Sequence, residues 1–163
     1  MRCFQSLVLK TVLGIAGLAA AACNSSGIVG PRDLARLAQA QARWDARPFA
    51  DYSYEIRISC FCPPEINRWT RVSVRNGAVV DAEAVEPDPQ FPITTIQWWQ
   101  PIDSLFATLH RAMTTDSFSS VYARIVVDYD KELGYPVHIE YVEKPTVADA
   151  AATIDIRNVA PLN

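Results

Sequence analysis

The stretch that most constrains the fold begins about a third of the way along the chain. Every second residue is aromatic or β-branched there, and the residues between are polar or charged. The apolar positions are Tyr52, Tyr54, Ile56 and Ile58. A period of two is typical of a strand with one face against a core. We therefore predict a central strand, ended by Pro63 and Pro64, because proline cannot donate a hydrogen bond to a sheet.

Cys60 and Cys62 continue the apolar parity of this strand, so we expect both thiols to face the core. Residues two apart in an extended strand have Cα atoms about 6.5–7 Å apart, at or beyond the limit for a disulfide. A Cys60–Cys62 bond therefore requires a turn or a bulge. We interpret the pair as a structural disulfide or as two buried thiols, contributing about 1.5 kcal/mol at most if bonded.

Two other interpretations of the cysteine pair remain. A redox-active pair needs nearby cations that lower a thiol pKa, and only Arg57 and Arg68 are close in sequence. A zinc site needs four ligands, and the chain has only two histidines, His110 and His138. We therefore predict no metal and no cofactor, although two-coordinate copper(I) stays open.

Residues 1–22 have the pattern of an export signal, with two basic residues, no acidic residue and an apolar run of small side chains. The run is too short to span a membrane, which takes about 20 apolar residues. It ends in four alanines before Cys23, which resembles the lipobox of bacterial lipoproteins. That resemblance implies cleavage before Cys23 and a lipid anchor on its thiol. The alternative is an ordinary secretory peptide that leaves Cys23 free.

Residues 23–30 have the composition of a flexible tether, and residues 31–163 have a length suited to one domain with one core. Removal of the signal leaves thirteen basic and eighteen acidic residues, a net charge of −5. An acidic chain argues against nucleic acid as a partner. The expected partners are the membrane, through the lipid, and an envelope protein or the cell wall.

The remaining pattern predicts two helices and five further strands. Helical periodicity covers residues 31–47 and the segment that starts at Pro101. Alternation predicts strands at residues 68–75, 78–85, 121–129, 137–141 and 154–156. The order is α-β-β-β twice, and short loops between consecutive strands favour antiparallel meanders. We predict an α+β fold with helices packed on one face of the sheet.

The two turns between strands have distinct signals. Asn76-Gly77 invites a two-residue hairpin loop, but that loop would place Val72 opposite Asp81. A three-residue loop with Gly77 in a bulge keeps Val72 opposite Val80, so we predict the latter. Residues 128–136 contain several carboxylates but lack the glycine position and the final glutamate of a calcium loop. We predict a turn with Gly134 at positive φ.

Trp98 and Trp99 lie between a proline-rich connector and the second helix. Adjacent residues do not both face one core easily, so we expect one of them to be exposed and to form part of a contact surface.

Two blocks together resemble a known family. They are Tyr52-Ser-Tyr54 leading to Cys60-Phe-Cys-Pro-Pro64, and Tyr129-Asp-Lys-Glu-Leu-Gly-Tyr-Pro136 leading to Ile139. They are similar to the bacterial lipoprotein domain termed domain of unknown function 6174, over roughly residues 44–158. The resemblance implies an exported, envelope-located protein and adds no catalytic residue.

The sequence contains no nucleophile elbow, no zinc-protease motif and no phosphate-binding glycine loop. We therefore expect a non-enzymatic, lipid-anchored envelope protein with an interaction or binding domain. The alternative is a thiol redox or copper-handling protein that uses Cys60 and Cys62. A third hypothesis is an enzyme that uses the carboxylates of Asp81 and Glu83, although a solvated strand face explains those residues as well.

Overall fold

The computed structural model describes residues 29–162, so Cys23, the predicted signal and most of the tether lie outside the described residues. The helices are α1 (Pro31–Asp45), α2 (Ile102–Thr114) and the short α3 (Asp116–Ser119). The strands are β1 (Tyr52–Ser59), β2 (Thr70–Arg75), β3 (Ala78–Ala84), β4 (Tyr122–Tyr129), β5 (Pro136–Glu143) and β6 (Ala152–Pro161). The predicted order of helices and strands is confirmed, with α3 added before β4.

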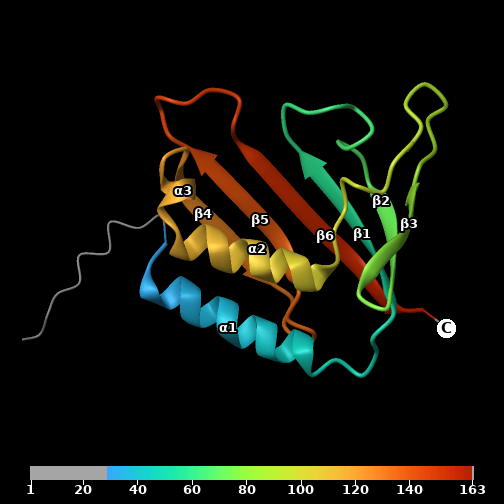
Figure 1. Cartoon of the computed structure of the whole chain (residues 1–163), viewed down its shortest axis with the longest axis horizontal. Coiled ribbons are helices and arrows are strands. Elements are labelled where there is room, and N and C mark those ends of the chain that lie inside the picture. The colour runs from blue at the N-terminus through green and yellow to red at the C-terminus, as the bar shows by residue number, and fades with distance from the viewer. Residues whose placement is uncertain (1–28, 163) are drawn as a thin grey trace, which may run out of the picture.

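The six strands form one sheet in the order β3-β2-β1-β6-β5-β4, and every neighbouring pair is antiparallel. Each half of the chain is a three-stranded meander. The halves join where β1 pairs with β6, so the first and last strands lie at the centre of the sheet. Both long helices lie on the same face of the sheet (Figure 1). The predicted α+β class is therefore confirmed.

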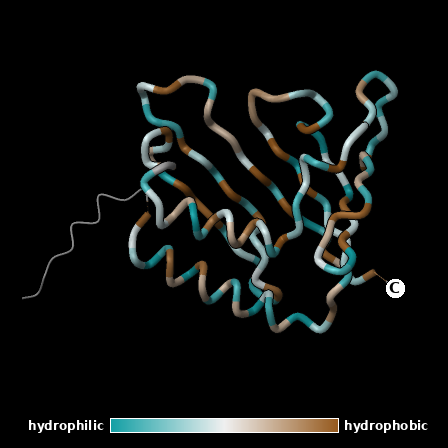
Figure 2. The backbone as a smooth tube through the Cα atoms, in the orientation of Figure 1, coloured by the Kyte–Doolittle hydropathy of each residue, from teal (hydrophilic) through white to brown (hydrophobic). Residues whose placement is uncertain are grey.

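The inward residues of β1 position the helices. Tyr52, Tyr54 and Ile56 are buried. Figure 2 shows hydrophobic and hydrophilic residues following one another along the strands. The Trp44 ring on α1 meets the Tyr52 ring edge to face, with centroids 5.1 Å apart. The Tyr52 hydroxyl accepts a hydrogen bond from the Ile102 backbone N–H at 2.9 Å. A single strand thus contacts α1 and fixes the start of α2.

The hairpin between β2 and β3 differs from the prediction. The loop has two residues, Asn76 (φ 50°) and Gly77 (φ 72°), so it takes the left-handed backbone of a tight hairpin. The pairing of the two strands shifts by one residue close to the turn, because Val74 pairs with Val79 but Ser73 pairs with Asp81. The apolar residues of both strands therefore stay on the same face. Val80 is the extra residue of this bulge and is 51% exposed. The three-residue loop was wrong because the bulge lies in the strand and not in the turn.

The turn before β5 agrees with the prediction. Gly134 has φ 83°, and β5 begins at Pro136. A side chain at Gly134 would also collide with the Ala40 carbonyl of α1. The Asp130 carboxylate accepts hydrogen bonds from the backbone N–H groups of Glu132 and Leu133. Its oxygens therefore stabilise the turn itself.

Candidate functional site

The face of the sheet opposite the helices, here called the outer face, carries the polar residues of every central strand. On β1 these are Ser53, Glu55 and Arg57, the positions between the buried residues. Glu55 lies beside Arg71 of β2 and beside Arg157 of β6. No helix of the described chain covers this face, as Figure 1 shows. The outer face is therefore a surface on which polar side chains from several strands converge.

Glu55 is the centre of the outer face. Only 7% of its side chain is exposed, although it points away from the core. Its carboxylate accepts hydrogen bonds from Arg71 at 3.2 Å, and from Arg157 and Asn158 at 2.9 Å each. Burial acts to raise the pKa of Glu55, but the bonds from Arg157, Asn158 and Arg71 outweigh it and hold the pKa below its usual value. The carboxylate is therefore ionised near neutral pH.

A second row of polar and charged side chains lies two residue pairs along the strands, at the next outward positions. Arg57 donates to one oxygen of Asp155 at 2.9 Å, and the other oxygen lies 2.7 Å from Nδ1 of His138. Burial acts to raise the pKa of Asp155, but the bonds to His138 and Arg57 outweigh it and lower the pKa. A row of side-chain contacts thus crosses from Arg57 on β1 to Asp155 on β6 and His138 on β5, and it fixes each side chain by its neighbours.

Trp69 lies at the edge of this network, directly before β2. The guanidinium of Arg157 lies 3.8 Å from the centre of its ring, and that of Arg57 lies 5.0 Å from it. The carbonyl of Trp69 accepts a hydrogen bond from the backbone N–H of Val85 at 2.9 Å. An indole is the strongest cation-binding ring in proteins, so Trp69 holds two cations in place.

A pocket of about 260 Å³ opens beside Trp69. It is lined by Arg57, Asn67, Arg68, Trp69, Val85, Glu86 and Arg157. Three guanidinium groups, an indole and an amide from β1, β6 and the segments that flank β2 and β3 thus surround one small space. A second, larger pocket of about 400 Å³ shares Arg68 with it and lies between β3 and the proline-rich connector.

The cysteine pair lies next to this pocket, and not in the core. β1 ends at Ser59, before Cys60, and both cysteines are only half-buried. They form a disulfide across a turn with Cα atoms 5.3 Å apart. The predicted disulfide is present, but the prediction that both sulfurs face the core was wrong, because the chain turns before the alternation reaches them.

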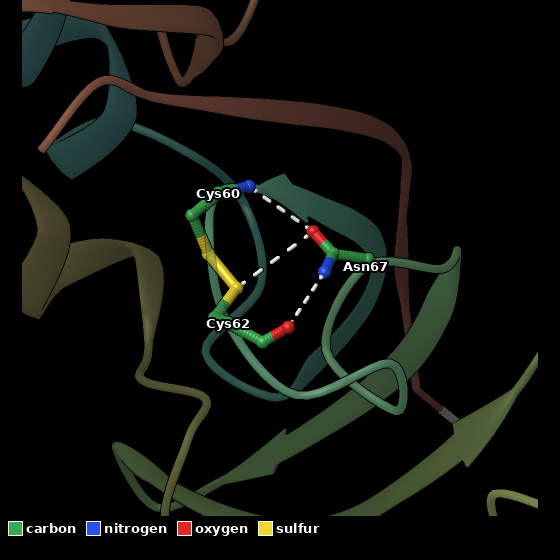
Figure 3. The surroundings of a disulfide bond; sticks show 3 residues. All are labelled: Cys60, Cys62 and Asn67. Carbon is green, nitrogen blue, oxygen red and sulfur yellow. Dashed lines mark hydrogen bonds between the residues drawn. A yellow bond between two sulfur atoms is a disulfide. The ribbon is translucent and has the colours of Figure 1, made fainter. Parts of the chain in front are cut away.

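Asn67 links the disulfide turn to the pocket (Figure 3). Its side-chain oxygen accepts a hydrogen bond from the backbone N–H of Cys60 at 3.1 Å and lies 3.7 Å from the sulfur of Cys62. Its amide nitrogen donates to the carbonyl of Cys62 at 3.1 Å. One side chain that lines the pocket therefore also fixes both ends of the disulfide turn.

The other predicted site residues are separated. Trp98 is 51% exposed and Trp99 is 5% exposed, so one tryptophan of the pair is exposed as expected, and Trp99 is a core residue. Glu83 lies on the outer face, 3.2 Å from Arg71. His110 is exposed on α2, in the other layer from His138. Cys23 lies outside the described residues.

Sequence reasoning missed Glu55, Arg157 and Trp69 as parts of one site. The signal for Glu55 and Arg57 was present, since both occupy outward positions of the predicted central strand. Arg157 could not be assigned, because β6 is ten residues long where only residues 154–156 were predicted as strand. Without the register of β6, its partners on β1 were undetermined.

Within the described chain, no helix has the length and apolar character needed to cross a membrane. In the same residues, no group of three or more histidine, cysteine or carboxylate side chains is placed to hold a metal ion.

The fold and the site together define a two-layer α+β domain whose charged sheet face is covered by none of the helices in residues 29–162. The family model described as Family of unknown function (DUF6174) matches residues 36–161, and the chain belongs to this family. No curated protein matches the chain. No solved structure matches it either.

Proposed function

We propose that the protein is a non-enzymatic, lipid-anchored protein of the bacterial envelope whose domain binds a partner through the outer face of the sheet. The observation that carries the proposal is the uncovered outer face around Glu55. A sheet needs one apolar face against a core, and its other face is free for recognition. The lipobox-like sequence before Cys23 supports the anchor, and the partner is an envelope protein or a component of the cell wall.

The chemistry of the outer face supports binding for a second reason. Its arginines are held by carboxylates and by the ring of Trp69, so they lose little freedom when a partner arrives. Arginine and tryptophan are enriched among the residues that dominate binding energy at interfaces. A pattern of fixed charges of both signs selects partners by complementarity more than it adds affinity. The outer face is therefore suited to specific recognition.

Photo-crosslinking in cells tests the binding surface. A photoreactive residue at Ser73, on the outer face of β2, is expected to capture a discrete partner. The control position is Ala107, which is exposed on α2 in the helical layer. Capture at Ala107 with equal yield, or no discrete product at Ser73, would contradict the proposed surface.

Substitution of the lipobox cysteine tests the anchor. Metabolic labelling with a clickable fatty acid is expected to mark the wild-type chain and not the Cys23→Ser variant, which should leave the membrane fraction. Membrane association of Cys23→Ser equal to that of the wild type would show that the anchor is wrong and would leave the binding surface untouched.

Thiol redox chemistry is the alternative function, and the position of the disulfide favours it. Cys60 and Cys62 are half-buried in a turn whose tip residue, Phe61, is 87% exposed. A partner protein with two thiols can reduce such a bond by exchange. The first thiolate attacks one sulfur to form a mixed disulfide and the second resolves it, so Cys60 and Cys62 gain two electrons and two protons and the partner keeps the disulfide.

Alkylation followed by intact-mass measurement distinguishes this alternative. A redox role requires a fraction of reduced, alkylated Cys60 and Cys62 in cells, and a copper role requires stoichiometric copper(I) binding that Cys60→Ser abolishes. A pair that is oxidised under every growth condition would leave only the structural role. The loss of that bond in a Cys60→Ala, Cys62→Ala variant should then cost at most about 1.5 kcal/mol, measured by denaturant unfolding.

A further inference from the structure

The pocket beside Trp69 contains more hydrogen-bond donors than the protein uses. A guanidinium group carries five N–H donors and no acceptor. Within residues 29–162, Arg157 donates through Nε to Glu55, and Arg57 donates through Nη2 to Asp155. The Nε of Arg57 is buried without a hydrogen-bond partner. The pocket therefore presents guanidinium groups whose remaining N–H groups are available to an acceptor.

Arg68 is the least constrained of the three cations. Its side chain makes no hydrogen bond or ion pair with any residue of the described chain, and it lines the pocket. Arg57 and Arg157 differ from it, because each has a carboxylate partner and lies against Trp69. Two fixed guanidinium groups and one free one thus surround the same small volume.

From this arrangement we propose that the pocket binds a carboxylate group carried on a small apolar body. Guanidinium groups bind carboxylates through paired N–H···O bonds, which matches the surplus of donors. The side chains of Val85 and Trp69 supply apolar surface beside those donors. A volume of about 260 Å³ lies below the usual range for drug-sized ligands, so the ligand group is small.

The charge balance of the pocket favours a single negative charge. When Arg71, which shares Glu55 with Arg157, is included, four arginines are matched by four carboxylates. They are Arg57, Arg68, Arg71 and Arg157 against Glu55, Glu83, Glu86 and Asp155. A carboxylate adds one negative charge to this balanced site, whereas a phosphate monoester adds nearly two. Repulsion from Glu86 therefore opposes a dianion more than a monoanion.

The inference deepens the proposed binding function, because it gives the chemical class that one part of the outer face recognises. The carboxylate has two possible sources, a free small acid or the C-terminal residue of a peptide. Both present the same planar anion to the guanidinium groups, so the experiment contains one arm for each source.

The test uses the full chain labelled with 5-fluorotryptophan and followed by ¹⁹F NMR, with the Trp69 resonance assigned through Trp69→Phe. Titration with benzoate is expected to shift the Trp69 resonance saturably and to leave the resonance of buried Trp44 unchanged. Benzamide has nearly the same shape without the charge, and it should cause no saturable shift. An equal response to benzamide, or no response to benzoate, would overturn the inference.

Two variants connect the response to the proposed donors. Arg68→Gln has no internal partner to lose, so it should fold normally and weaken benzoate binding about tenfold. Arg111→Gln removes the same charge from the exposed side of α2 and should leave binding unchanged. Equal affinities of Arg68→Gln and the wild type would show that the pocket does not bind the anion.

Further ligands identify the source and the charge. The dipeptide acetyl-Ala-Phe is compared with its C-terminal amide. Tighter binding of the free acid than of benzoate assigns the pocket to peptide ends, and binding no tighter than benzoate assigns it to free acids. Both results support carboxylate recognition, whereas phenyl phosphate binding tighter than every carboxylate would overturn the preference for a single charge.

Failure of this test is distinguishable from failure of the proposed function. If benzoate does not bind but Ser73 still captures a partner in cells, the outer face is a binding surface and only the carboxylate pocket is wrong.

Discussion

The two faces of β1 are stabilised by opposite physical means. On the inner face, Tyr52 and Tyr54 are fully buried among aromatic rings. On the outer face, Glu55 is almost as inaccessible, yet its neighbours are two arginines and an amide. Apolar burial depends on side-chain volume, whereas burial of a carboxylate depends on donors in the right places. The comparison teaches that a position hidden from water need not belong to the core.

The largest expected effect tests the inner face. Trp44→Ala removes a fully buried ring and its hydrogen bond to Asp103, so we expect a loss of about 3–5 kcal/mol in the free energy of unfolding, measured by urea denaturation. The matched control is Trp98→Ala, an exposed tryptophan whose loss should change stability by less than about 0.5 kcal/mol. Similar losses in both variants would contradict the location of the core.

A smaller effect tests the outer face. Glu55→Gln removes the charge that three donors share, and we expect a loss of about 1–2 kcal/mol, since the arginines are half-exposed and recover part of their hydration. Glu83→Gln is the control, because the more exposed Glu83 carboxylate has a single ion pair within residues 29–162, to Arg71. The Glu83→Gln variant should lose less than about 0.5 kcal/mol in the free energy of unfolding. A Glu55→Gln variant as stable as Glu83→Gln would show that the network around Glu55 contributes little.

The smallest effect is a difference in acid sensitivity. The folded-state pKa values of Glu55 and Asp155 are lowered, so their contribution to stability is complete above the unfolded pKa values of about 4.3 and 3.9. It is lost as the pH falls through the folded values. Urea unfolding at a series of pH values should therefore show a shallower decline below about pH 4 for a Glu55→Gln, Asp155→Asn variant than for the wild type. Identical declines would refute this assignment.

Much of the fold could be predicted from the sequence, because the signals were local. The alternation from Tyr52 to Ile58 placed the central strand, and Gly134 with Pro136 placed the turn before β5. A period of two and a positive-φ glycine each depend on a few adjacent residues. Such signals do not require knowledge of partners elsewhere in the chain.

The errors arose where a residue outside the alternating pattern determines the structure. The cysteines were predicted to face inward because parity was extended past Ser59, where the chain turns and is fixed by Asn67. A three-residue loop was predicted at Asn76-Gly77 because it keeps the apolar residues of both strands on one face. The extra residue Val80 has the same effect within β3. The burial of Glu55 depends on Arg157, about a hundred residues away, so no local pattern could reveal it. The candidate site was therefore mostly invisible in the sequence.

The position of β6 has a consequence for how the protein is made. β6 is synthesised after the other five described strands, yet it lies in the middle of the sheet, where it pairs with both β1 and β5. The β1–β3 meander and the β4–β5 hairpin therefore share no strand pairing until residues 152–161 are in place. A premature stop that removes residues 152–161 would leave two separate groups of strands with no hydrogen-bonded pairing between them. The effect would be larger than the loss of one strand.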